Sequence, residues 1–463
     1  MKLTKNQHYL LTTLAMAFIF TLPLKAQVTI GSQDDPSNFS ILELISTEGG
    51  LRLPQLSDQD ILDLTNSELS TPEAKEAAKG LVVYNTTINC LEFWNGEKWI
   101  SLCQSTMGTG TETDPYLVCS PEALDAMRDK PDAHYKLCQN IDLTDYLSTG
   151  AGQTKWGSNG WMPIGDATTP FTGSLDGAGY TVSGMWIQRI TTGNLGLFGV
   201  VNNGTIENLG VSTSNINGST GTYIGGLVGR ISASGVISNC WVTGTGTISG
   251  SSYIGGIAGG IDGGSSVTGC YASVKMSGSN SIGGLVGLVG TGADNNGNIT
   301  NCYATGSVTG GGSNIGGLVG QIYTGNITNC YATGAVSGTG PSSNDVVGGI
   351  LGRITNATTS ITNCVALNPS VTAAYGTDVG RVLGRTDASS ATRSNNWALS
   401  NMTITVNGGT PKSPLANTGN GLDGADVSSA NSTSTSWWTS ASLGPGWDSA
   451  IWNFAEGELP KLK

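Results

Sequence analysis

Five cysteines recur at nearly even intervals in the second half of the chain: Cys240, Cys270, Cys302, Cys330 and Cys364. Cysteines hold zinc when they occur in closely spaced pairs or together with histidines. The chain has no Cys-x-x-Cys pair, and His134 is the only histidine after residue 26. We therefore predict no metal site and no cofactor. The even spacing instead predicts one inward stack of small, buried and inert side chains.

An aromatic residue follows each of the first four cysteines: Trp241, Tyr271, Tyr303 and Tyr331. If equivalent positions of successive repeats lie above one another, these rings form an outward row. Rings at regular intervals along a groove suit the apolar faces of sugars, so glycan contact is one hypothesis. The structural alternative is that the rings stack on each other or lie under a loop. The sequence leaves both interpretations open.

Three arginines share a register, because each follows the closing glycine of a repeated phrase: Arg230, Arg353 and Arg385. Arg353 and Arg385 are one repeat apart, so adjacent coils would bring their like charges together. A bound anion, such as a sulfated or uronic acid sugar, would relieve that repulsion. Splaying of the two side chains into water would relieve it too.

Acidic residues are sparse in the repeats, with one per coil or fewer: Glu207, Asp262, Asp294, Asp345 and Asp378. A polysaccharide lyase or hydrolase needs a cluster of acids, and a metalloprotease needs His-Glu-x-x-His, which does not occur. We therefore predict that the chain is not an enzyme. A lyase or hydrolase on the same scaffold remains the enzymatic alternative.

The element that positions these residues is a repeat in the region 195–385. The phrase Ile/Val-Gly-Gly-Leu-Val-Gly, or a variant, begins at Leu195, Ile224, Ile254, Ile282, Ile315, Val347 and Val379. Such a period indicates a solenoid whose units bury their apolar faces on their neighbours. Short β-rich runs separated by Gly, Ser, Thr and Asn predict a β-helix, with about three strands per coil. Alternation places Cys302 and Leu318 inside and Tyr303 outside.

The phrase Ile-Gly-Gly-Leu-Val-Gly, preceded by Asn-Cys-Tyr-Ala-Thr-Gly, resembles the GLUG motif repeats of bacterial secreted and surface proteins. The segments that flank the repeats, from Gly108 to Lys463, resemble those that accompany GLUG motifs in exported, Bacteroidetes-like proteins. The resemblance implies an all-β, right-handed parallel β-helix that is often adhesin-like. It implies no enzymatic reaction.

The first 26 residues resemble a secretory signal peptide, with Lys2 and Lys5 before an apolar run and Ala26 at the expected cleavage site. We therefore expect an exported protein at the cell surface, in the extracellular space or at the outer membrane. No other run is long and apolar enough to suggest a transmembrane segment. The net charge of −12 makes nucleic acid an unsuitable partner.

Residues 27–107 have ordinary charge density, and we predict that they form a small α+β N-terminal module. Asn95-Gly96 lies between alternating apolar residues, which predicts a hairpin. The hairpin would bring Cys90 opposite Cys103, and a disulfide is expected in an exported chain. The segment resembles an N-terminal module of exported Bacteroidetes proteins, which suggests presentation or assembly, including a homo-oligomer.

Two end segments should close the solenoid. Residues 108–194 read as a cap followed by the first coils, in which Cys119 and Cys138 form either a disulfide or two buried thiols. Residues 386–463 read as a last coil and a cap. Four tryptophans of this segment should seal the C-terminal end of the core rather than bind sugar: Trp437, Trp438, Trp447 and Trp452.

Together these features predict an exported, non-enzymatic β-helix that acts in adhesion by binding a glycan or a host protein at a cell surface. A structural component of a surface fibre is the second hypothesis.

Overall fold

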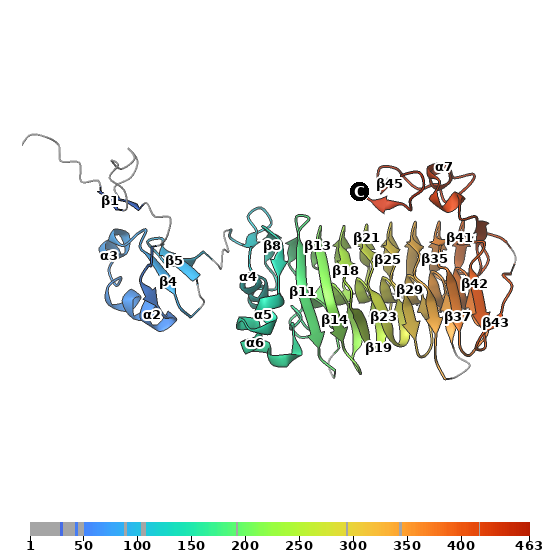
Figure 1. Ribbon diagram of the computed structural model, residues 1–463, viewed down its shortest axis with the longest axis horizontal. Coiled ribbons are helices and arrows are strands. Elements are labelled where there is room, and N and C mark those ends of the chain that lie inside the picture. Colours follow the sequence, from blue (N-terminus) through green and yellow to red (C-terminus); the bar gives the residue numbers. More distant parts are fainter. Residues whose placement is uncertain are drawn as a thin grey trace, which may run out of the picture. The chain divides into compact units, whose positions relative to one another are not determined.

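The computed structural model describes residues 28–30, 42–44, 51–87, 90–102, 108–190, 193–292, 295–341, 345–415 and 417–463 (Figure 1). The chain divides into two compact units, residues 1–99 and residues 100–463. The expected signal peptide, residues 1–26, lies outside the described residues, and so does Cys103 of the expected Cys90–Cys103 pair. None of the helices in the described ranges has the length and apolarity to cross a membrane.

The described residues of the N-terminal unit form two helices and two small sheets. Strand β1 (Val28–Ile30) pairs in parallel with β2 (Leu42–Leu44). A second sheet has the order β3 (Gln55–Leu56), β4 (Val82–Asn85), β5 (Cys90–Trp94) and β6 (Trp99–Ser101). Helices α2 (Asp58–Ser67) and α3 (Pro72–Ala77) begin at side-chain caps from Ser57 and Thr71. Trp94 is buried and contacts Trp99 edge-on, with ring centroids 5.6 Å apart, as the hairpin pattern predicts.

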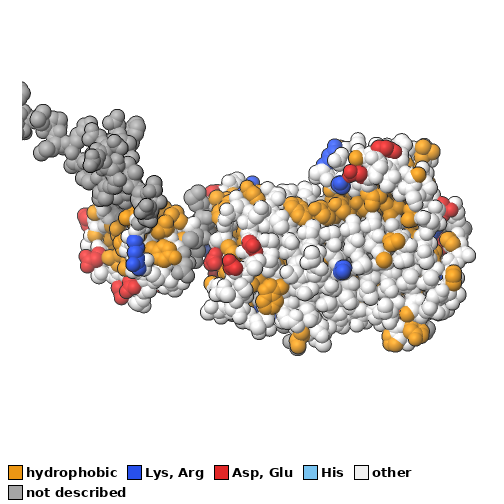
Figure 2. Space-filling model, viewed as in Figure 1, with side chains coloured by type: hydrophobic (Ala, Val, Ile, Leu, Met, Phe, Trp, Pro, Cys, Tyr) orange, Lys and Arg blue, Asp and Glu red, His pale blue; other side chains and the backbone are white. Residues whose placement is uncertain are grey.

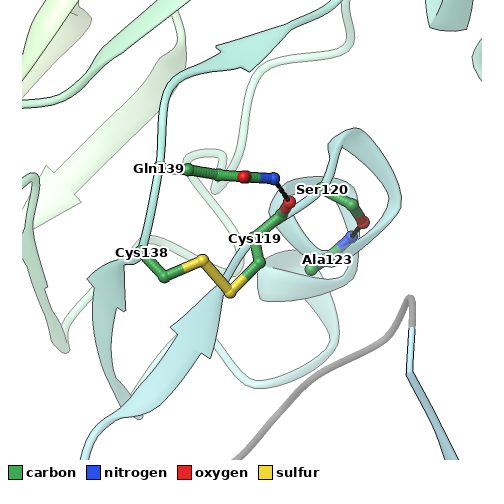
Figure 3. The surroundings of a disulfide bond; sticks show 5 residues. All are labelled: Cys119, Ser120, Ala123, Cys138 and Gln139. Carbon is green, nitrogen blue, oxygen red and sulfur yellow. Dashed lines mark hydrogen bonds between the residues drawn. A yellow bond between two sulfur atoms is a disulfide. The ribbon is translucent and has the colours of Figure 1, made fainter.

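The second unit begins with a cap of short helices at the N-terminal end of the solenoid (Figure 1). These are α4 (Pro121–Ala126), η1 (Met127–Asp129), α5 (Thr144–Ser148), α6 (Ala151–Trp156) and η2 (Gly157–Asn159). Ser120 caps α4 by accepting a hydrogen bond from the amide of Ala123. Cys119 and Cys138 form a disulfide that ties the start of α4 to the adjoining strand (Figure 3).

In the described part of the chain, the solenoid has three walls of parallel strands, which we call A, B and C. Wall A has the strands β7 (Tyr116–Val118), β8 (His134–Leu137), β10 (Ser174–Asp176), β13 (Thr205–Glu207), β17 (Val236–Ser238), β21 (Ser265–Thr268), β25 (Gly297–Thr300), β30 (Gly325–Thr328), β35 (Thr359–Thr362) and β40 (Thr392–Ser394). Wall B has β12 (Phe198–Asn202), β16 (Val228–Ser232), β20 (Ala258–Ile261), β24 (Val286–Val289), β29 (Val319–Ile322), β34 (Leu351–Ile354) and β39 (Leu383–Thr386).

Wall C contains the remaining strands of the rod, two or three from most coils, and is joined at its C-terminal end by one antiparallel strand, β43. Its strands are β9 (Ile141–Asp142), β11 (Thr181–Gln188), β14 (Gly210–Asn217), β15 (Thr222–Gly225), β18 (Trp241–Thr243), β19 (Thr247–Gly255), β22 (Tyr271–Ala272), β23 (Lys275–Gly283), β26 (Tyr303–Ala304), β27 (Val308–Gly310), β28 (Ile315–Gly316), β31 (Tyr331–Ala332), β32 (Val336–Gly338), β33 (Val346–Gly348), β36 (Val365–Ala366), β37 (Ser370–Ala373), β38 (Asp378–Gly380), β41 (Trp397–Leu399), β42 (Thr403–Val406), β43 (Thr410–Pro411) and β44 (Ala425–Val427).

One continuous apolar core fills the space between the walls. The parallel β-helix predicted from the sequence is thus confirmed, and so are its inward positions. Cys302 and Leu318 are fully buried, whereas Tyr303 lies on the outside of wall C. Each repeat unit pairs in register with the next, so equivalent residues lie above one another.

Glycine and asparagine shape the corners of each coil. A Cβ on Gly316 would lie 1.9 Å from the carbonyl oxygen of Val319, which explains the first glycine of the repeated phrase. The residue before each stacked cysteine is left-handed, with φ of 54° at both Asn301 and Asn329. Asparagine tolerates this conformation, and its amide bonds to the next one: Asn329 Nδ2 donates to Asn301 Oδ1 at 3.1 Å.

The loop between β43 and β44 packs against the core through Leu422, whose carbonyl oxygen accepts from the amides of Val382 and Leu383 at the last strand of wall B. Arg381 is buried there and holds the loop through several hydrogen bonds. Its Nε donates to the carbonyl oxygen of Asp423 at 3.0 Å, and its Nη1 donates to Asp426 Oδ1 at 2.6 Å. A buried guanidinium with these partners satisfies backbone carbonyls that the last coil would otherwise leave unpaired.

The four C-terminal tryptophans lie elsewhere than predicted. The segment 428–463, which we call the C-terminal segment, folds back along the side of the rod, with η3 (Asn431–Thr433), α7 (Thr435–Thr439), β45 (Trp452–Asn453) and β46 (Lys461–Leu462) (Figure 1). Its tryptophans pack on Tyr331 and Val365 of wall C. The predicted end cap was therefore wrong, because the outer face of wall C offers an apolar strip that buries these indoles.

Candidate functional site

The predicted aromatic row exists on the outer face of wall C. Trp241, Tyr271, Tyr303 and Tyr331 start the strands β18, β22, β26 and β31, and each pairs with the next in register. Successive ring centroids are 6.4, 4.8 and 4.8 Å apart, with interplanar angles of 10°, 1° and 6°. The coil repeat therefore produces a stack of nearly parallel rings.

The ring faces in this row are covered by one another. At the N-terminal end of the row, Gly210 pairs with Trp241, and a Cβ on Gly210 would lie 2.4 Å from the indole carbon Cε2. The indole thus lies against the backbone of Gly210. Because the flat faces are occupied, the rings offer mainly their edges, and Tyr271 and Tyr303 their hydroxyl groups, to a partner. The rings therefore stack on one another, which is the structural alternative to glycan contact on their faces.

Tyr331 is not available to a partner, because the C-terminal segment covers it. Only 2 % of Tyr331 is exposed, and its hydroxyl donates to the carbonyl oxygen of Pro460 at 2.8 Å. Trp438, Trp447 and Trp452 surround it, with centroid distances of 6.0 to 6.1 Å. The hypothesis that Tyr331 binds a ligand is therefore corrected.

Trp241, Tyr271 and Tyr303 are half-buried, and of these Tyr303 also contacts Trp452 of the C-terminal segment. Figure 2 shows a strip of hydrophobic side chains that continues along the rod from beneath this segment. A groove of about 440 Å³ lies where the strip meets the segment. Its walls come from two parts of the chain: Tyr271, Ser273, Tyr303, Thr305 and Tyr331 of wall C, and Glu458, Leu459 and Lys461 of the C-terminal segment.

The groove can form hydrogen bonds as well as apolar contacts. Lys461 and Glu458 pair across its rim, with Nζ and Oε2 2.7 Å apart. Burial raises the pKa of the Tyr271 and Tyr303 phenols, so both hydroxyls stay protonated and can donate at neutral pH. Sequence reasoning missed the C-terminal wall, because nothing local in Glu458 to Lys461 indicates where that segment lands.

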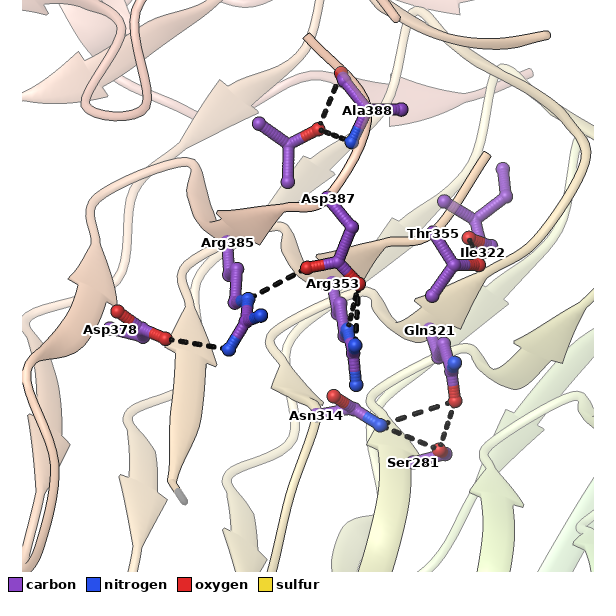
Figure 4. A network of polar contacts seen from close by, with 11 residues as sticks. Ser281, Asn314, Gln321, Ile322, Arg353, Thr355, Asp378, Arg385, Asp387 and Ala388 are labelled. Atoms are coloured by element: carbon purple, nitrogen blue, oxygen red, sulfur yellow. Dashed lines mark hydrogen bonds and ion pairs between the residues drawn. The ribbon is translucent and has the colours of Figure 1, made fainter. Parts of the chain in front are cut away.

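The three arginines in register all have carboxylate partners. Arg353 and Arg385 are in register on β34 and β39, and the carboxylate of Asp387 lies between them (Figure 4). One of its oxygens accepts from Arg353, and the other accepts from Arg385 Nε at 2.7 Å. Arg385 also pairs with Asp378, and Arg230 pairs with Asp262 at 2.7 Å.

Asp387 therefore takes the part that was proposed for a bound anion, and the expected anion site on Arg230, Arg353 and Arg385 is corrected. Burial alone would raise the pKa of Asp387, but hydrogen bonds from both guanidinium groups hold it below its usual value. The signal was present in the sequence, because Asp387 follows Arg385 by two residues and a strand repeats its faces with that period.

The five repeat cysteines form the predicted inward stack and are free and fully buried. The sulfurs of Cys270, Cys302 and Cys330 each accept from the cysteine amide of the preceding coil, as in Cys270 N to Cys302 Sγ at 3.4 Å. Burial raises the pKa of the Cys302 and Cys330 thiols, which keeps them protonated. At the next coil Asn396 replaces cysteine, and its side-chain oxygen accepts from the Cys364 amide at 3.1 Å.

Comparison with known families identifies the repeats. The family described as "the GLUG motif" matches residues 250–276, 278–309 and 311–337. The chain therefore contains three GLUG motif repeats. A second family, described as "phage tail like trimerisation region", matches residues 29–114.

Two curated relatives of the chain are much longer than the segments they share with it. A Gly-rich membrane protein of Evansella cellulosilytica is 37 % identical over an alignment of 142 residues, which covers 28 % of this chain and 15 % of that protein. Halomucin of Haloquadratum walsbyi is 34 % identical over an alignment of 244 residues, which covers 49 % of this chain and 2 % of halomucin. The chain thus spans only a small part of the relatives it matches.

A crystal structure from Bacteroides ovatus shares the fold. That protein carries the provisional description of an immunoglobulin A1 protease. The alignment covers 77 % of this chain and 94 % of that one, with a TM-score of 0.51 and 20 % identity. At that identity the likeness concerns the β-helix and not the activity. Among the described residues, no group of three or more potential metal ligands occurs.

Proposed function

We propose that this GLUG repeat protein is a non-enzymatic subunit of a trimeric surface assembly. Three N-terminal regions associate, and each carries one β-helix as a rod that contacts a glycan or protein partner. The observation that carries the proposal is the order of the two family matches, a trimerisation region at residues 29–114 followed by GLUG repeats. A trimer would multiply a weak contact of each rod into a stronger joint attachment.

The contact surface in this proposal is the groove beside the aromatic row. It joins apolar ring edges to the hydroxyls of Tyr271 and Tyr303 and to the charged pair Glu458 and Lys461. Interfaces commonly combine aromatic residues with such polar groups. The names of the relatives, a Gly-rich membrane protein and halomucin, support a place at the cell surface.

A passive role is supported by the way the acids of the rod are used. Asp262 and Asp378 are paired with arginines, and Asp345 is buried. Each of these carboxylates is therefore occupied by contacts within the protein or is shielded from solvent. Asp345 and Asp378 lie on neighbouring coils, since Val346 pairs with Asp378, but Asp378 is paired with Arg385 and Asp345 accepts from the backbone amide of Tyr375.

The test is the mass of the intact particle. The mature chain, purified at micromolar concentration, should contain three chains per particle by native mass spectrometry and by light scattering. The variant Trp94→Ala removes the buried ring that packs on Trp99, so it should weaken the trimer while the β-sheet circular dichroism of the rod persists. A wild-type chain that is monomeric throughout the micromolar range would overturn the proposal.

A further inference from the structure

A second hollow lies in the N-terminal cap, remote from the aromatic groove in sequence. It has a volume of about 490 Å³, within the range of about 300–1,000 Å³ that is usual for small-molecule sites. Its lining comes from η1, from the end of α6, from residues 162–169, and from Arg189 with residues 193–195. Four segments that the β-helix brings together thus enclose one cavity.

One side of the cavity is apolar. Trp156, Met162 and Pro163 line it, and Met162 is 37 % exposed. Two contacts fix the Trp156 ring. Arg128 lies over it at 4.8 Å from the ring centroid, and the indole Nε1 of Trp156 donates to Asp125 Oδ1 at 3.2 Å. A rigid indole edge beside two apolar side chains can take up the C–H groups of a sugar ring.

Two guanidinium groups line the cavity, and both are held in place by backbone carbonyls. Arg128 donates to the carbonyl oxygens of Met162 at 2.9 Å and Pro163 at 3.1 Å, and it pairs with Asp125. Arg189 donates to the carbonyl oxygens of Trp161 at 3.1 Å and Gly160 at 3.2 Å. Burial and the charge of Arg128 lower the pKa of Arg189. Such fixed donors lose little freedom when a ligand binds.

Two carboxylates complete the polar part of the lining. Asp129 and Asp166 are exposed members of the cavity wall. Asp166 is oriented by its own turn, because its Oδ1 accepts from the amides of Thr168 and Thr169, each at 2.8 Å. In addition, the side-chain oxygen of Asn194 is buried at the cavity wall and accepts no hydrogen bond from the described residues.

This mixture of groups selects among ligand classes. A phosphate or a carboxylate would be attracted by the two arginines but repelled by Asp129 and Asp166. A hydroxyl group donates to a carboxylate and accepts from a guanidinium, so a polyol uses both kinds of group. The apolar wall adds a surface for the ring carbons. We propose that the cap cavity binds a neutral pyranose unit of a glycan.

The test uses the mature chain and a panel of neutral pyranosides, with glucuronate and inorganic phosphate as competing ligand classes. Binding is followed by saturation-transfer NMR and calorimetry. Asp166→Asn keeps the oxygen that caps the turn and removes the charge, so affinity should fall about tenfold. Trp156→Ala should reduce it by at least as much. Asp145→Asn, an exposed carboxylate on α5, is the matched control and should bind as wild type does.

Thermal melts establish whether each variant is folded. If Trp156→Ala does not fold, Asp166→Asn alone tests the cavity. Three outcomes would overturn the proposal: no pyranoside binds at millimolar concentration, phosphate or glucuronate binds in place of pyranosides, or pyranoside binding persists in the folded cavity variants but is lost in Tyr271→Ala. The proposal does not rest on trimer formation, since particle mass is measured separately.

Discussion

At the scale of single residues, a buried carboxylate stands out on wall C. Asp345 is 1 % exposed, its Oδ2 accepts the amide of Tyr375 at 3.3 Å, and its Oδ1 has no partner among the described residues. Burial raises the pKa of Asp345 above its usual value. The folded state therefore binds this proton more tightly than the unfolded state, and stability is lost as pH rises through the folded-state pKa.

We expect Asp345→Asn to stabilise the protein at neutral pH by about 1 kcal/mol, because the amide keeps an oxygen for Tyr375 and carries no charge. The gain should vanish below pH of about 3.8, where the wild-type carboxyl is protonated in both states. Melting temperatures at pH 7 and pH 3 measure both effects. Asp378→Asn, at an exposed ion pair, should change stability by less than about 0.5 kcal/mol. A lower melting temperature for Asp345→Asn at pH 7 would contradict the argument.

At the scale of elements, the C-terminal segment is held to wall C by tryptophan packing. Trp452 is 1 % exposed and stacks on Trp447, with centroids 4.6 Å apart. It also contacts Tyr303 at 6.2 Å. This segment makes one wall of the groove, so its docking decides whether the groove exists.

Trp452→Ala should cost roughly 3 to 5 kcal/mol of docking free energy, the usual range for removing a buried tryptophan. We expect faster amide hydrogen exchange in residues 428–463, with the strands of walls A and B unchanged. Ile451→Ala alters a neighbouring exposed side chain and should leave exchange as in wild type. Faster exchange throughout the rod would mean that the segment and the rod open together, against this prediction.

At the scale of the whole molecule, the rod is one stack in which each coil buries its neighbours. The five stacked thiols report on this stack, because each lies in a different coil and all are fully buried in one core. In the native protein we expect none of the five to react with a thiol reagent. With rising denaturant, all five should become reactive over one transition, which mass spectrometry of alkylated peptides can follow.

A rod that opens coil by coil would give a different result. Labelling of Cys364 or Cys240 at lower denaturant than Cys302 would show fraying from the ends. Labelling of any of them in the native state would contradict the closed core. The matched reference is the same protein unfolded before the reagent is added, in which each of these thiols should react.

The amino-acid sequence by itself determined the coil, its period and its inward residues. Each coil is a local unit of about thirty residues that repeats one pattern, so Cys302, Leu318 and Tyr303 could be placed from alternation and repetition alone. The aromatic row followed from the same repetition. The ion pair of Arg385 with Asp387 could also have been found, since Asp387 follows Arg385 by two residues, directly after the end of β39, and an extended chain repeats its faces with that period.

Only the tertiary structure decided where the C-terminal segment lies. Tyr331 and Pro460 are 129 residues apart and meet through one hydrogen bond, which no local pattern indicates. Burial of tryptophan is equally favourable against the end of the core or against its side, because the hydrophobic effect has no direction. In the folded protein the tryptophans pack on the outer face of wall C. This packing covers Tyr331, which leaves the candidate site, and forms the groove beside Tyr303.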